Sequence, residues 1–137
     1  MAAMPFALEG IDHIVLRVSD LARMRSFYCE VLGCSLEREQ PELGLTQLRA
    51  GVSLIDLVTR DGRLGRNAPA GPGHNLEHLC LRVAPYEEAA LLAWLAAHGV
   101  SAHDPAMRYG AQGEGRSLYL EDPEGNRVEL KAALPRG

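Results

Sequence analysis

The stretch Asp12-His13-Ile14-Val15-Leu16-Arg17-Val18 decides the fold, because a near copy of it, Glu77-His78-Leu79-Cys80-Leu81-Arg82-Val83, occurs later in the chain. In both copies apolar side chains alternate with other residues, which is typical of a strand with two different faces. Both copies also place a histidine at the same point. The sequence therefore predicts a duplicated module in which each copy contributes one histidine to the same face of a sheet.

The composition of the 137 residues is that of an ordinary globular protein, with 47% hydrophobic and 23% charged residues, and the length predicts a single domain, 1–137. The net charge is −4 and the basic residues are dispersed, which argues against nucleic-acid binding. The start of the chain lacks the features of a secretion signal, and no segment is long and apolar enough for a membrane span. Three cysteines without metal-binding spacing favour free thiols in the cytoplasm.

Periodicity and turn residues predict the order β-α-β-β-β twice. The first module, 11–60, has strands at 11–18, 34–39, 45–50 and 52–58 and a helix over 20–32. The second module, 76–132, has strands at 77–83, 100–104, 116–121 and 127–132 and a helix over 86–98. Residues 61–75 are rich in Gly, Pro and Ala and are predicted to be a linker. The fold class is α+β: tandem βαβββ modules forming an open, barrel-like sheet around a metal cleft.

Each module also carries an acid on the face predicted to hold its histidine. In 52–58, Asp56 alternates with the apolar Ile55 and Leu57, and in 127–132 Glu129 lies between two apolar neighbours. Four candidate ligands therefore share the cleft face: His13, Asp56, His78 and Glu129. Imidazole nitrogen with carboxylate oxygen suits a divalent ion such as Zn, Ni, Co, Mn or Fe(II). Aspartate is shorter than glutamate by about one C–C bond, so a three-ligand site without Asp56 is the alternative.

Other side chains are candidates for binding a small-molecule substrate in the same cleft. Strand alternation, loop position or, for Arg116, a charge suited to an anionic substrate selects these candidates: Gln47, Arg82, Tyr109, Arg116 and Tyr119. The glycine-containing segment 108–115 is interpreted either as a substrate-side loop or as a plain connector. Arg82 has the alternative of pairing with surface acids. His74, His98 and His103 are expected to be solvent-exposed.

Three features together resemble the vicinal oxygen chelate superfamily over about residues 11–132. They are the duplicated βαβββ pattern, the helix end Phe27-Tyr28-x-x-Val31-Leu32-Gly33, and the segment Asp122-Pro-Glu-Gly-Asn-Arg-Val-Glu129-Leu130. That superfamily contains glyoxalase I, extradiol dioxygenases, fosfomycin-resistance thiol transferases, methylmalonyl-CoA epimerase and bleomycin-resistance proteins. The resemblance is specific for the superfamily rather than for one activity.

The ligand pattern is most similar to that of short bacterial glyoxalase I. The resemblance implies a metal held by His13, Asp56, His78 and Glu129, lyase or isomerase chemistry with Glu129 as base, and a homodimer. In this chain Asp56 stands where that enzyme has glutamate. Extradiol dioxygenases and fosfomycin-resistance enzymes, which use two histidines and one glutamate, imply alternative chemistries. Bleomycin-resistance proteins imply a different class, a metal-free binding protein that sequesters its ligand.

Overall fold

The structure is a computed structural model that describes residue 7 and residues 9–66 and 76–135. The chain divides into two compact units, Met1–Ala68 and Pro69–Gly137, which we call unit 1 and unit 2. The boundary falls within the expected linker 61–75, of which 67–75 lies outside the described residues. In the part that is described, no helix has the length and apolar character needed to cross a membrane.

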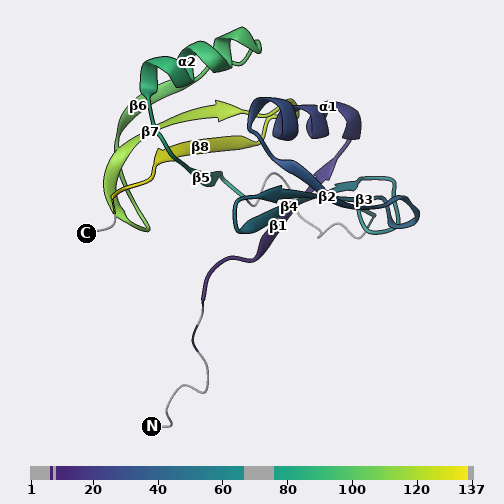
Figure 1. The fold of residues 1–137 in the computed structure, drawn as a ribbon. Coiled ribbons are helices and arrows are strands. Elements are labelled where there is room, and N and C mark those ends of the chain that lie inside the picture. Colours follow the sequence, from purple (N-terminus) through teal and green to yellow (C-terminus); the bar gives the residue numbers. More distant parts are fainter. Residues whose placement is uncertain (1–6, 8, 67–75, 136–137) are drawn as a thin grey trace. The chain divides into compact units, whose positions relative to one another are not determined.

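Unit 1 is one four-stranded sheet with a helical segment after its first strand (Figure 1). Its elements are β1 (His13–Val18), α1 (Leu21–Ser26), the π-helical turn η1 (Phe27–Val31), β2 (Ser35–Gln40), the 3-10 turn η2 (Pro41–Leu43), β3 (Leu45–Ala50) and β4 (Ser53–Thr59). The strand order is β1-β4-β3-β2. β1 runs parallel to β4, and the other pairs are antiparallel.

Unit 2 repeats this arrangement with different lengths. Its elements are β5 (Leu79–Val83), α2 (Glu88–Ala97), β6 (His103–Gly110), β7 (Gly113–Glu121) and β8 (Arg127–Ala132). The strand order β5-β8-β7-β6 matches that of unit 1, again with one parallel pair, β5 and β8. The predicted α+β class and the duplicated βαβββ order are confirmed.

Two details of the predicted elements are wrong. The helix expected over 20–32 is α-helical only to Ser26 and continues as the π-helical turn η1. The segment 108–115, expected to be a loop, belongs to a hairpin in which β6 extends to Gly110 and β7 begins at Gly113. Its glycines were interpreted as loop residues, but they lie where a side chain of the neighbouring strand needs space, as shown below.

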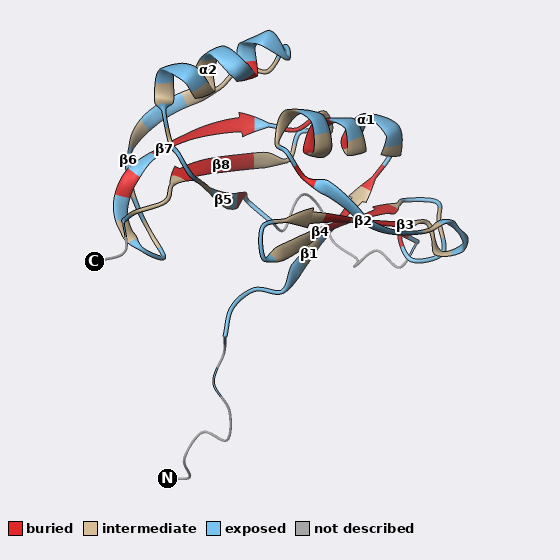
Figure 2. Ribbon diagram, in the orientation of Figure 1, coloured by how far each residue is buried: buried red, intermediate tan, exposed pale blue. Residues whose placement is uncertain are grey.

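Each unit has its own apolar core beneath one face of its sheet (Figure 2). In unit 1, Ile55 and Leu57 of β4 are 2% and 0% exposed, and Met24 and Tyr28 of the helical segment are also fully buried. In unit 2 the buried aliphatic residues are Leu79, Leu95, Leu118, Leu120, Val128 and Leu130. The residues that alternate with these apolar positions on β4 and β8 include three buried charged groups, Asp56, Glu129 and Lys131. We call this opposite face of each sheet its carboxylate face.

Candidate functional site

In unit 1, strand pairing brings His13 and Asp56 to the carboxylate face. His13 begins β1, and Asp56 lies in the neighbouring β4, two residues past the register partner of His13. The distance from His13 Nε2 to Asp56 Oδ2 is 4.0 Å. The Nδ1 atom of His13 lies 2.7 Å from Oδ1 of the preceding Asp12. This hydrogen bond is the main reason that the pKa of His13 is raised above 6.5.

The carboxylate of Asp56 is held by a second side chain of the same unit. Gln47 of β3 is the register partner of Asp56. Its Nε2 donates to both carboxylate oxygens, at 3.3 and 3.2 Å. Gln47, predicted as a substrate-binding residue, therefore lies beside the candidate ligand and orients it.

In unit 2, His78 and Glu129 repeat this geometry at closer range. His78 directly precedes β5, and its Nε2 lies 3.2 Å from Oε1 of the buried Glu129 on β8. The Nδ1 atom of His78 lies 3.0 Å from Oε1 of the preceding Glu77. Glu77 in turn accepts hydrogen bonds from Nη1 of Arg127 at 2.9 and 3.1 Å. The bond to His78, followed by the contacts with Arg127, lowers the pKa of Glu77.

Both histidines are thus fixed in the way typical of metal ligands, with one ring nitrogen bonded to a carboxylate and the other directed at a candidate ligand. The orienting acids, Asp12 and Glu77, were missed by sequence reasoning. A signal for them existed, because each repeated stretch begins with an acid directly before the histidine. The repeat conserves the type of side chain as well as its place.

Tyr119 of β7 lies beside Glu129 on the carboxylate face of unit 2. It is the register partner of Glu129 on one side and of His103 on the other, and it is 9% exposed. The ring lies edge-on to His78, with centroids 5.6 Å apart. The guanidinium groups of Arg108 and Arg127 lie over the ring at 4.5 and 3.9 Å. Tyr119 was predicted to face the same side as the candidate ligands, and the structure places it beside His78 and Glu129.

The remaining predicted substrate-binding residues divide between the two faces of the unit 2 sheet. Arg82 shares the face of Glu129, because it is paired with Lys131 on β8. Arg116 lies on the opposite face of β7 and bonds Glu88 of α2 at 2.9 and 3.2 Å. Tyr109 is paired with Glu114, also away from the carboxylate face, and is 80% exposed. The structure therefore does not bring Arg116 and Tyr109 to the His78–Glu129 pair, because their strand positions have the opposite parity.

The other histidines have separate surroundings. His98 follows α2 and bonds the backbone oxygen of Trp94. His103 begins β6 and bonds both Asp104 and Glu121, at 3.0 and 2.8 Å. His74 lies outside the described residues.

Cys80 lies next to Glu129 in the parallel pairing of β5 and β8. Partial desolvation on the sheet, followed by the Glu129 carboxylate, raises the pKa of Cys80 to about 11. The thiol is therefore neutral at physiological pH, which does not suit a nucleophile. Its register partner Glu129 places Cys80 on the carboxylate face of unit 2, and the prediction that it lines a cleft stays a prediction.

The donor set of the candidate residues is the same in kind in both units. Within the described residues of either unit, no three His, Cys, Asp or Glu side chains are arranged so that they could hold a metal ion. Each unit instead offers one oriented imidazole and one buried carboxylate. Nitrogen and carboxylate oxygen donors in this ratio suit Zn, Ni, Co, Mn or Fe(II).

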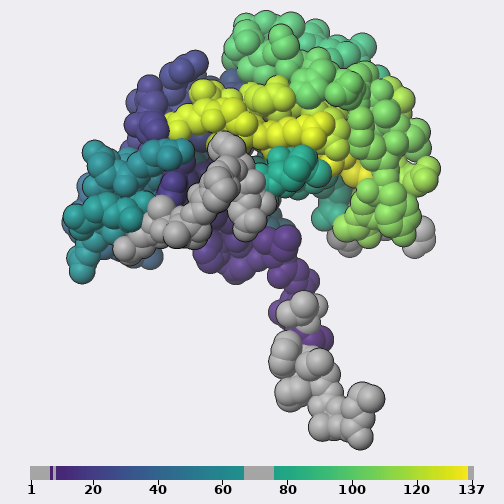
Figure 3. Space-filling model, turned by 180° about the vertical axis from the view of Figure 1, so that it is seen from behind, coloured from purple at the N-terminus to yellow at the C-terminus, as the bar shows by residue number. Residues whose placement is uncertain are grey.

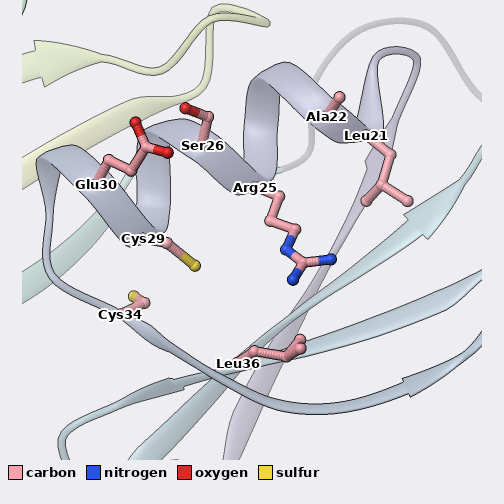
Figure 4. Close-up of a pocket in the computed structure, with 8 residues that line it drawn as sticks. All are labelled: Leu21, Ala22, Arg25, Ser26, Cys29, Glu30, Cys34 and Leu36. Atoms are coloured by element: carbon pink, nitrogen blue, oxygen red, sulfur yellow. The ribbon is translucent and has the colours of Figure 1, made fainter.

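Unit 1 also contains a pocket of about 570 Å³ that includes none of these residues (Figure 4). It is lined by Leu21, Ala22, Arg25, Ser26, Cys29, Glu30, Cys34 and Leu36. Arg25 forms an ion pair with Glu39, and burial raises the pKa of Cys34 to about 11. The pocket thus has neither an unpaired cation nor a thiolate among these groups.

Comparisons with known proteins give a family and several relatives. The family model described as Glyoxalase/Bleomycin resistance protein/Dioxygenase superfamily matches residues 10–130. The virulence protein STM3117 of Salmonella typhimurium is 31% identical over 125 residues, which cover 90% of this chain and 83% of that protein. The crystal structure of that protein has a TM-score of 0.78 and covers 94% of this chain and 100% of the other.

Two further relatives carry names of different functional classes. Catechol-2,3-dioxygenase of Bacillus subtilis is 27% identical over 127 residues, covering 92% of this chain and 42% of the enzyme, so the chain spans less than half of its length. The crystal structure of TnmS3, an antibiotic-binding protein from Streptomyces sp. CB03234, has a TM-score of 0.71 and 25% identity. It covers 94% of this chain and 99% of that chain. The relatives therefore include both an enzyme and a binding protein.

Proposed function

The chain belongs to the glyoxalase/bleomycin resistance protein/dioxygenase superfamily, and on that premise we propose that it is a metal-dependent enzyme of the vicinal oxygen chelate type. Its ligands are His13 and Asp56 from unit 1 and His78 and Glu129 from unit 2. Its chemistry is a glyoxalase-like lyase or isomerase step on a small substrate with two neighbouring oxygens. In this proposal the protein works as a homodimer, since family members commonly pair modules within or across chains.

One observation carries the proposal: the same oriented pair occurs twice. In each unit a carboxylate one residue earlier binds the histidine Nδ1 atom, and Nε2 faces a buried strand carboxylate. A histidine that serves only packing has no need of this arrangement, and two histidines that share it by chance would be unusual. The arrangement supports metal ligation because outer carboxylates of this kind orient ligating imidazoles.

A bound divalent ion would supply Lewis acidity, stabilising negative charge that develops on a substrate oxygen. The protein residues do the remaining work in this proposal. Glu129, buried against Tyr119, takes a proton from a substrate carbon and returns it to the neighbouring carbon. Tyr119, with the guanidinium groups of Arg108 and Arg127 over its ring, excludes water from one side of the Glu129 carboxylate. The role of Asp56 is to complete the ligand set from unit 1.

A second candidate is a metal-free binding protein, which the likeness to the antibiotic-binding TnmS3 favours. The looser pair in unit 1, at 4.0 Å, agrees with that candidate better than the pair in unit 2. The two candidates differ in their need for the four ligand residues. A binding pocket without metal keeps its ligand affinity when a histidine is removed, whereas a metal site does not.

The test is metal content by mass spectrometry on untagged protein that has never met a chelator, followed by reconstitution with nickel, zinc, cobalt, manganese and iron(II). We expect near-stoichiometric binding of at least one ion, and loss of it in His78→Ala. His98→Ala is the matched control, because His98 bonds a backbone oxygen outside the proposed site. Metal-loaded protein is then assayed with the hemithioacetal of methylglyoxal. Absence of metal uptake under all these conditions would contradict the proposal and favour the binding protein.

A further inference from the structure

Lys131 is the only lysine of the chain, and it is buried in unit 2 with 6% of its surface exposed. Its Nζ donates a hydrogen bond to the backbone oxygen of Gly113 at 2.9 Å. Within the described residues, that is its one hydrogen bond, and no carboxylate forms an ion pair with it. Burying a charge is costly unless it is paired. The ammonium group thus has capacity for an anionic partner that the described chain does not supply.

The sheet leaves a defined space for this side chain. A Cβ atom at Gly110 would lie 2.9 Å from Lys131 Cε, and one at Gly115 would lie 3.1 Å from Nζ. Strands β6 and β7 therefore lack side chains at the places where the lysine lies. Figure 3 shows β8, in yellow, beside the green β6–β7 hairpin. The glycines leave room for the Lys131 side chain to lie along the sheet, where its Nζ bonds the backbone oxygen of Gly113.

The position of Lys131 on the carboxylate face gives it a second relevant property. Its register partners are Arg82 on β5 and Ser117 on β7, so this row across the sheet carries two cations and no acid. Glu129 lies two residues earlier on the same strand. Two residues of strand span about 7 Å. A small substrate can therefore contact Glu129 with one part and Lys131 with another.

We propose that Lys131 binds the carboxylate of a small acidic substrate whose reacting carbon lies at Glu129, with Arg82 at the outer side of the same carboxylate. This inference rests on the proposed function and names the class of substrate for that site. A carboxylate fits the available charge, because Arg108 is already engaged by the backbone oxygens of Asp104 and Ser117. Phosphate and phosphonate dianions usually take several free cations or a bidentate arginine.

The single lysine allows a direct test on the metal-free full-length protein, using lysine labelled with ¹³C at Cε. The probes are succinate, its neutral isostere succinamide, and inorganic phosphate. We expect the single Cε resonance to shift saturably with succinate and not with succinamide. Phosphate is expected to bind more weakly than succinate. An unmoved resonance, an equal response to succinamide, or tighter binding of phosphate would overturn the inference.

Two variants separate the ammonium group from general electrostatics. Lys131→Met keeps the length of the side chain, and we expect it to weaken succinate binding by about 10- to 100-fold, measured by calorimetry. Arg60→Met removes the same charge from the exposed turn after β4 and is expected to bind as the wild type does. Gly110→Ala crowds the Lys131 side chain while keeping its charge, and we expect an intermediate loss. Unchanged succinate affinity in Lys131→Met would overturn the inference.

Metal uptake of Lys131→Met, measured separately, keeps the two proposals apart. We expect this variant to bind metal as the wild type does, since Lys131 supplies no ligand. Wild-type protein that binds metal but does not bind succinate would reject the inference alone. Failure of metal binding in the wild type would reject the proposed function while leaving the carboxylate site measurable.

Discussion

The two units share a strand order and a register, yet their carboxylate faces differ in almost every side chain around the shared pair. In unit 1 the neighbours of Asp56 on the adjoining strands are Val15 and Gln47. In unit 2 the neighbours of Glu129 are Cys80 and Tyr119. Two residues further along the strand, the buried Val58 of unit 1 is replaced in unit 2 by the buried Lys131.

The comparison teaches that the shared strand register places a histidine near a carboxylate in both units, while the side chains around this candidate pair differ. The parallel pairing of the first and last strands fixes the histidine and the acid in both units. Around the pair of unit 2, Arg127 and Arg108 lie over the ring of Tyr119 and Lys131 is buried, whereas unit 1 has the uncharged Gln47 and Val58 at the positions that match Tyr119 and Lys131. We therefore expect unit 2 to carry the reactive chemistry and unit 1 to serve mainly as a ligand donor.

The largest expected effect comes from removing the carboxylate of each pair. Glu129→Gln should lower metal affinity by more than about 100-fold, beyond the usual cost of an outer-sphere substitution. Asp56→Asn should lower it by about tenfold, because Asp56 is shorter, lies 4.0 Å from its histidine and remains bonded to Gln47. Competition with a chromophoric chelator measures both. Equal losses would mean that the two units contribute alike.

A smaller effect is expected from the acids that orient the histidines. Glu77→Gln should reduce metal affinity by about 10- to 100-fold, in the range known for outer-sphere partners. Asp12→Asn should have a weaker effect, because Asp12 is highly exposed whereas Glu77 is also held by Arg127. The same chelator competition applies, with Glu124→Gln as a control in the turn before β8. A larger loss of metal affinity in Asp12→Asn than in Glu77→Gln would contradict the expectation that unit 2 orients its histidine more firmly than unit 1.

The turns before the last strand of each unit offer a comparison of stability. Asp122 accepts hydrogen bonds from the backbone N–H groups of Glu124 and Asn126 and from the Asn126 side chain. Asp122→Ala should lower the free energy of unfolding by about 2 kcal/mol, since each such bond contributes roughly 1 kcal/mol. In unit 1 the turn residue Val52 is 96% exposed, and Val52→Ala should change stability by less than about 0.5 kcal/mol. Urea denaturation measures both changes.

The smallest effect concerns pH and the edge strands. His103 of unit 2 occupies the register place that Arg38 occupies in unit 1. Hydrogen bonds to Asp104 and then to Glu121 raise the pKa of His103 above 6.5. Its stabilising contribution is therefore complete below pH 6.5 and is lost as the pH rises through the higher folded-state pKa. We expect NMR titration to show a midpoint above 6.5 that Glu121→Gln lowers. A His103 midpoint that Glu121→Gln leaves unchanged would show that the Glu121 carboxylate does not act on His103.

Much of this arrangement could be predicted from the sequence, because period-two alternation is a local property of strands. It placed His13, Asp56 and Glu129 opposite the apolar residues of their strands, and the structure confirms the burial of Ile55 and Leu57. Alternation also correctly put Tyr119 on the face of Glu129. These predictions succeed because the face of a strand residue depends only on parity once the apolar face is known.

Other features depend on contacts between distant strands, which a single sequence does not encode locally. Gly110 and Gly115 indicated a loop, but they are strand residues that make room for Lys131. Burial of Lys131 itself is invisible until β6 and β7 are placed beside β8. Arg116 was selected for its charge, and its partner Glu88 is contributed by a helix 28 positions earlier. Arg116 is an odd number of residues before Tyr119 on the same strand, so alternation alone would have placed it on the face opposite to Tyr119.

The identical strand order of the two units has a consequence for protein engineering. The strands of each unit pair only with one another, and each unit has its own buried core. One unit can therefore be exchanged without changing the strand pairing of the other. A recombinant chain built from two copies of the second unit would carry two His–Glu pairs and two copies of Lys131.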